Sequence, residues 1–177
     1  MKYFLIETSP KIAKIPMLMR WYEKFDVRDI HVKSAYKIPN RELILIRSDL
    51  ETVYTDIISR PVFLMSEKAK DVVHMYEPNT IWKEFVLLDK DNARVARYFL
   101  PVFEEIDCLS KYSVFNLDHS EIKKMVLNRS KIKDSSIFQV SGVNKQYIIG
   151  NLDIVESLLK RNMVGVGITE VVWEEAE

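Results

Sequence analysis

The stretch that spans residues 61–78, PVFLMSEKAKDVVHMYEP, constrains the fold more than any other part of the chain. Its apolar run VFLM is typical of a buried strand. Ser66 follows directly, and serine is a favoured helix N-cap because its hydroxyl accepts a hydrogen bond from a backbone N–H of the first turn. Apolar side chains then recur at helical spacing until Pro78, at Ala69, Val72, Val73 and Tyr76. The stretch therefore predicts a strand that leads directly into a helix.

A looser unit of the same kind closes the chain between residues 147 and 173. Its first residues, YII, predict a strand, and a helix capped by Asn151 or Asp153 follows. We expect Gly165 to stop this helix, because glycine readily adopts the left-handed conformation found just after helix ends. A final strand then extends to Trp173. Strand–helix pairs are thus predicted for both the middle and the end of the chain.

Several other segments have the composition of strands. Residues 2–7, KYFLIE, are rich in aromatic and branched side chains. Residues 41–47, RELILIR, have an unbroken apolar centre, which predicts a strand buried on both faces. Residues 81–88 and 95–100 flank a turn-forming sequence rich in Asp and Asn, so they predict a hairpin that ends at Pro101. SIFQVSG and QYIIG predict a second hairpin that turns after Gly142.

Three segments leave the choice of structure open. Residues 17–25 place Met17, Leu18, Trp21, Tyr22 and Phe25 on one face of an amphipathic helix, although irregular sequence surrounds them. Residues 50–59 fit a short helix by apolar spacing and a strand by their β-branched residues. Residues 121–132 fit either a helix capped by Ser120 or a strand followed by a turn.

These elements predict an α+β fold with a mainly antiparallel sheet and about three helices. We expect the central and C-terminal helices to pack on one face of that sheet. No linker rich in Pro, Gly or Ser divides the 177 residues, so we expect a single domain over residues 1–177.

Charge and cysteine content limit the classes of function. The chain carries 26 basic and 26 acidic residues, a balance that argues against nucleic acid as a partner. Only four consecutive apolar residues precede Glu7, too few for a signal peptide or a membrane span, so we expect a cytoplasmic protein without a membrane partner. The single cysteine, Cys108, excludes an internal disulfide and a multi-cysteine metal site.

The candidate reactive side chains predict structural roles. His31, His74 and His119 lack a second ligand at the short spacing common in zinc sites, and we expect a helix-end cation at His74 and surface residues at the other two. Asp118, His119 and Ser120 are adjacent, so they cannot point at one another as a catalytic triad must. Cys108 lies among acidic residues, which disfavour a thiolate, so we expect a buried, inert thiol.

The remaining candidates also favour structural roles. Glu104, Glu105 and Asp107 predict a solvated acidic turn rather than an acid–base pair or a cation site. The four glycines all lie at or after Gly142, and GVG follows a helix, which is the wrong context for a phosphate loop. Trp82 and Trp173 are expected in core packing, and the acidic tail WEEAE in solvent. We therefore predict no catalytic, cofactor-binding or metal-binding residue, and the sequence does not single out partner-binding residues.

The order of several motifs resembles a bacterial immunity-protein family, first described as a domain of unknown function in myxobacterial proteins. The motifs are PVFLMSEKAKDVV, WKEFVLLD, RYFLPVFEEIDCLS, SIFQVSG and IIGNLDIVESLLKRNMVGVGITEV. Within the last motif, Leu158, Leu159, Gly165 and Glu170 match the style of the family. The resemblance covers residues 61–177, and residues 1–60 do not match.

The resemblance implies a non-enzymatic protein that binds and neutralises a cognate toxin, without a cofactor. The family has no catalytic signature to carry over to this chain. An enzyme that acts on a small molecule, whose residues converge only in the folded state, is the alternative, together with a scaffold or regulatory subunit. A deep pocket with converging polar groups would favour the enzyme, and a large exposed apolar patch would favour the inhibitor or the scaffold.

Overall fold

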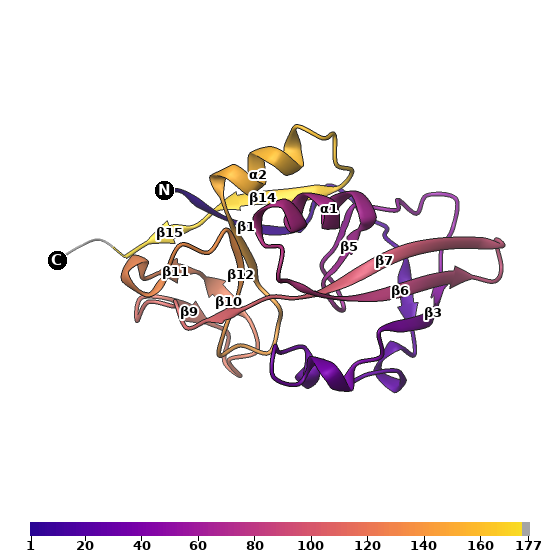
Figure 1. Ribbon diagram of the computed structural model, residues 1–177, viewed down its shortest axis with the longest axis horizontal. Helices are drawn as coiled ribbons and strands as arrows, with labels where there is room; N and C mark the ends of the chain where they lie inside the picture. The colour runs from indigo at the N-terminus through magenta and orange to yellow at the C-terminus, as the bar shows by residue number, and fades with distance from the viewer. Residues whose placement is uncertain (175–177) are drawn as a thin grey trace.

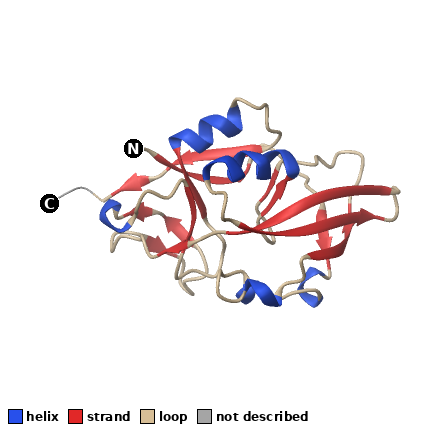
Figure 2. Ribbon diagram, in the orientation of Figure 1, coloured by secondary structure: helices blue, strands red, loops and turns tan. Residues whose placement is uncertain are grey.

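The computed structural model describes residues 1–174, and its framework consists of two larger β-sheets with α-helices packed on them (Figure 1). Residues 175–177, the end of the predicted acidic tail, lie outside the described residues. The predicted α+β class is confirmed, with strands as the main component (Figure 2).

The larger sheet has six strands in the order β2-β3-β6-β7-β5-β4. The strands are β2 (Met17–Met19), β3 (Arg41–Arg47), β4 (Ile57–Ile58), β5 (Leu64–Ser66), β6 (Ile81–Asp89) and β7 (Arg94–Val102). The β6–β7 pair is the predicted hairpin, which continues through Pro101, opposite Trp82. β3 and β6 run parallel and the other pairs antiparallel, so the sheet is mixed.

The second sheet has five strands in the order β14-β1-β13-β12-β8. The strands are β1 (Tyr3–Thr8), β8 (Glu105–Ile106), β12 (Ile137–Val140), β13 (Ile148–Asn151) and β14 (Val166–Glu170). The antiparallel β12–β13 pair confirms the second predicted hairpin. Two short pairs complete the strands: β9 (Val114–Phe115) with β10 (Ile122–Lys124), and β11 (Val126–Leu127) with β15 (Val172–Trp173). Residues 121–132 thus form short strands and a turn.

The central strand–helix unit forms as predicted. α1 (Glu67–Tyr76) begins after Ser66, whose Oγ accepts a hydrogen bond from the backbone N–H of Ala69 at 3.2 Å. α2 (Leu152–Leu159) follows β13 in the same way, with Asn151 Oδ1 accepting from Ile154 N–H at 3.1 Å.

Three predictions about the helices are wrong. The described residues contain two α-helices rather than three, with four 3-10 helices of three residues each: η1 (Trp21–Glu23), η2 (Val27–Asp29), η3 (Ala35–Lys37) and η4 (Arg129–Lys131). The two α-helices do not share one sheet face: α1 packs on β5 and β7, and α2 on β13 and β1. Each helix packs beside the strand that leads into it, and the chain builds these strands into different sheets. α2 also ends well before Gly165, which adopts a φ of 69° in the turn to β14.

Residues 17–25 form β2 and η1 instead of the amphipathic helix that their apolar spacing allowed. Residues Met17–Met19 gain backbone hydrogen bonds by pairing with β3, and Arg20 then turns the chain with a φ of 49°. Leu18 and Phe25 are still buried in the core. The apolar spacing therefore predicts which side chains are buried, but not the backbone conformation.

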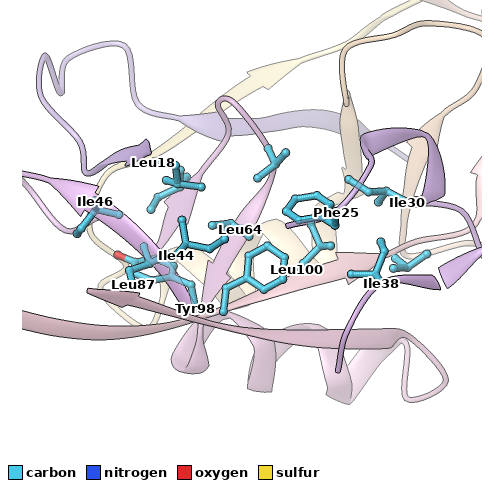
Figure 3. Close-up of a cluster of buried hydrophobic side chains, with 14 of the residues drawn as sticks. Leu18, Phe25, Ile30, Ile38, Ile44, Ile46, Leu64, Leu87, Tyr98 and Leu100 are labelled. Carbon is cyan, nitrogen blue, oxygen red and sulfur yellow. The ribbon is translucent and has the colours of Figure 1, made fainter. Parts of the chain in front are cut away.

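The core lies on both sides of the six-stranded sheet. On one face, strand side chains pack against residues 18–38, which pass beneath β6 and β7 in Figure 1. Figure 3 shows this cluster, which includes Leu18, Phe25, Ile30, Ile38, Ile44, Ile46, Leu64, Leu87, Tyr98 and Leu100. On the other face, a second cluster joins side chains of both sheets and both α-helices, among them Ile6, Met65, Val72, Ile148 and Ile154. α1 and α2 contact each other above it.

Candidate protein-binding surface

β3 is buried on one face only, contrary to the prediction of a strand buried on both. Ile44 and Ile46 are almost fully buried in the core of Figure 3. Leu43 and Leu45 point to the other side of the sheet, where 45% and 36% of their surface is exposed. Successive side chains of a strand lie on opposite faces, so this alternation identifies a sheet face that the protein leaves open to solvent.

The neighbouring strands extend this apolar surface in register. Leu43 lies opposite Val86 of β6, and Leu45 lies between Met19 of β2 and Leu88 of β6. Directly opposed residues share a face of the sheet, so these side chains form continuous rows. Val95 of β7 continues the second row beyond Leu88, and Met17 lies at the outer strand. We call this surface the open sheet face; it consists of Met17, Met19, Leu43, Leu45, Val86, Leu88 and Val95.

The open sheet face remains uncovered because α1 is short. α1 lies over β5 and the nearer half of β7, where Phe99 is buried and Lys70 lies over its ring at 4.3 Å. The β6–β7 hairpin extends past the end of α1, to the right in Figure 1. Residues 18–38 cover the opposite face of the sheet, so they do not shield these side chains.

Ion pairs separate the open sheet face from α1. Glu84 on β6 pairs with Arg97 at 2.7 Å and with Arg41 at 3.3 Å, and Arg97 also lies 3.6 Å from Glu67 on α1. The hydrogen bond from Arg97 and the nearby positive charges lower the pKa of Glu84, so its carboxylate stays charged. An exposed apolar centre beside a charged rim is typical of a surface that binds another protein.

A groove lies beside the open sheet face, along the outer strand β2. Its cavity volume is about 750 Å³, and residues 13–18 and 47–49 form much of its wall together with Trp21, Thr52, Arg60 and Pro61. Met17 and Arg47 belong to the groove and lie opposite each other at the edge of the open sheet face. We call this cavity the edge groove.

The histidines occupy separate surroundings. His31 is not a free surface residue: its Nδ1 lies 2.6 Å from Glu105 Oε2, and the pair joins residues 18–38 to β8. His74 is exposed in the last turn of α1, as expected. The ring of His119 packs 5.0 Å from that of Phe115. Among the residues that the structure describes, no cluster of three His, Cys, Asp or Glu side chains could hold a metal ion.

The other candidates have mainly structural surroundings. Glu105 accepts a hydrogen bond from Gln139 as well as contacting His31, so the predicted acidic turn is partly buried and structural. Cys108 is fully buried, and burial raises the pKa of its thiol to about 11. Ser120 Oγ donates to Asp118 at 2.7 Å, a local turn contact that does not involve His119.

The tryptophans combine packing with one surface role. Trp82 packs edge-on against Phe103, and Trp173 against Tyr3. Trp21 packs against Phe25 and also lines the edge groove, so it contributes to a candidate site.

The open sheet face was not predicted, because the apolar run RELILIR alone does not show which of its two faces other elements cover. One signal was available in β7, the strand beyond β6, where Val95 lies between Arg94 and Arg97 in the sequence RVAR. Charged residues so close to the turn indicate that this end of the hairpin faces solvent on both sides. An apolar strand that lies beside this hairpin, as β3 does through its pairing with β6, would then be expected to expose one face as well.

No protein-family model matches the chain, and no curated protein matches it. Within residues 1–174, no helix has both the length and the apolar character needed to cross a membrane.

Proposed function

We propose that this protein binds a partner protein through the open sheet face. We further propose that the partner is a cognate bacterial toxin, which the protein neutralises in the cytoplasm by covering its surface. Protein binding is supported by one observation: seven apolar side chains on four adjacent strands form a continuous surface, in which Met17, Leu43, Leu45 and Val95 are exposed and the other three are half-buried. The toxin as partner is supported by the resemblance of residues 61–177 to immunity proteins.

Inhibition by occlusion requires a complementary surface rather than positioned acids and bases, so it needs no cofactor. The apolar rows would supply the dehydrated centre of the interface. The network of Glu84, Arg41 and Arg97 lies beside those rows and would supply orienting charges.

The edge groove gives less support to an enzyme that acts on a small molecule. Asp49 and Lys14 in its lining pair with each other at 2.8 Å, and this contact lowers the pKa of Asp49. A carboxylate stabilised in its charged form is a poor general acid near neutral pH. A scaffold or regulatory subunit would use the open sheet face in the same way, so only a test of toxin neutralisation separates it from an inhibitor.

The test is co-expression of the tagged protein with the product of the adjacent gene. We expect a stable complex and growth of cells that the adjacent product alone would kill. Leu45→Glu should weaken binding at least about tenfold, because it places a charge at the centre of the interface. Leu117→Glu is the matched control, since Leu117 is fully exposed outside the open sheet face and its replacement should leave binding unchanged.

The outcomes separate the alternatives. A complex that forms without protecting cells would indicate a scaffold or regulatory subunit. The absence of both complex and protection would overturn the proposed function. Equal binding by the Leu45→Glu and Leu117→Glu variants would reject the open sheet face as the binding surface.

A further inference from the structure

The edge groove follows an outer strand of the six-stranded sheet. Within the described residues, β2 pairs with β3 on one side only, and it ends the order of strands. An outer strand presents backbone N–H and C=O groups along its free edge, and an extended peptide can add to such an edge. Met17 and Leu18 of β2 line the groove, so a segment lying in the groove would contact this strand.

The charges in the groove are unequal. Its lining contains three cations, Lys14, Arg47 and Arg60, and one carboxylate, Asp49. Lys14 is already held by Asp49 at 2.8 Å and by Glu51 at 2.6 Å. Arg47 and Arg60 are exposed, and neither has an ion pair or hydrogen bond to another described side chain. Two guanidinium groups are therefore left to bind an anion, and guanidinium binds carboxylates well because it can donate two parallel hydrogen bonds.

The rest of the lining is apolar. Ile15, Leu18, Trp21 and Pro61 contribute to it, and Leu18 and Trp21 are anchored by the core cluster of Figure 3. Side chains of an extended segment alternate in direction, so apolar residues could contact this floor while acidic residues between them reach the arginines. A volume of about 750 Å³ is within the range of sites that hold small ligands or a few side chains.

We propose that the edge groove binds an extended acidic segment of the partner protein, which lies alongside β2 and pairs its carboxylates with Arg47 and Arg60. The identity of the partner rests on the proposed function, whereas the chemistry of the segment rests on the groove. Met17 and Arg47 join the groove to the open sheet face, so one partner can contact both surfaces.

The test uses the full chain and two labelled synthetic peptides. In one peptide glutamate alternates with leucine, and in the other lysine replaces each glutamate. We expect saturable binding of the glutamate peptide by fluorescence anisotropy, binding that weakens as salt is added, and no comparable binding of the lysine peptide. Arg47→Glu and Arg60→Glu should each weaken binding of the glutamate peptide at least about tenfold, because each reverses a contact charge.

The control variant is Lys33→Glu, which makes the same change of charge at an exposed residue outside the groove. It should change peptide affinity less than about twofold, because Lys33 does not line the groove and its exposed charge is screened by salt. Circular dichroism and the melting temperature should be alike in all three variants, since all three positions are exposed.

Absence of saturable binding, equal binding of both peptides, or unchanged affinity in both arginine variants would overturn the proposal.

The test also separates this proposal from the proposed function. Peptide binding by a protein that does not capture the adjacent gene product would support the groove and overturn the toxin partner. Toxin capture that persists unchanged in both arginine variants would overturn the groove and leave the proposed function standing.

Discussion

Leu45 of β3 lies directly opposite Leu88 of β6, and both side chains belong to the open sheet face. Ile44, the residue before Leu45, points the other way into the core. One strand thus contributes both to the stability of the fold and to the candidate binding surface, through alternate residues. This arrangement allows the two roles to be tested separately with neighbouring substitutions.

We predict that Ile44→Glu destabilises the protein far more than Leu45→Glu. Ile44 is 1% exposed, so Ile44→Glu should lower the free energy of unfolding by about 3 kcal/mol or more by placing an unpaired charge in the core. Leu45→Glu should change it by less than about 1 kcal/mol, because the new carboxylate reaches water. Urea unfolding measures both values. Similar losses of unfolding free energy in the two variants would contradict the assignment of Ile44 to the buried face of β3 and Leu45 to its exposed face.

A second prediction concerns Val72, which is buried on the inner side of α1. Val72→Asp should destabilise the fold by several kcal/mol, on the order of 3, since the carboxylate would lie among the apolar side chains between the two sheets. Met75→Asp is the control on the same helix, because Met75 is 58% exposed and its replacement should cost about 1 kcal/mol or less. A melting temperature unchanged by Val72→Asp would reject the packing of α1.

A third prediction concerns Cys108 and alkaline pH. Burial raises the pKa of this thiol from 9.0 to about 11, so the folded state holds its proton where the unfolded chain releases it. The resulting stability is fully present below pH 9 and is lost as the pH rises toward 11. Within that window this group alone should lower the free energy of unfolding by up to about 1.4 kcal/mol per pH unit.

Urea unfolding of the wild type and of Cys108→Ala across this pH range measures the effect. The free energy of unfolding of Cys108→Ala should fall less steeply with rising pH than that of the wild type, whatever the stability of the variant at neutral pH. Some decline should remain, because burial also raises the pKa of Tyr98. If the free energy of unfolding falls equally steeply with pH in the two proteins, the thiol does not contribute to this pH dependence.

The sequence by itself determined the elements whose stabilising contacts are close along the chain. Ser66 caps α1 through Ala69, three residues later, and Asn151 caps α2 through Ile154 in the same way. The β6–β7 hairpin also follows from a local turn between two apolar runs. Such contacts depend on spacing alone, so their residue types are enough to predict them.

Only the tertiary structure decided which surfaces are covered. Met17–Met19 had a helical apolar pattern, but pairing with β3 gave their backbone groups partners and fixed them as a strand. The contact between His31 Nδ1 and Glu105 Oε2 joins segments far apart in the sequence. The exposure of Leu43 and Leu45 depends on where α1 ends above a neighbouring part of the sheet. Burial is a property of the assembled layers, and an apolar strand has the same sequence whether one of its faces is covered or both.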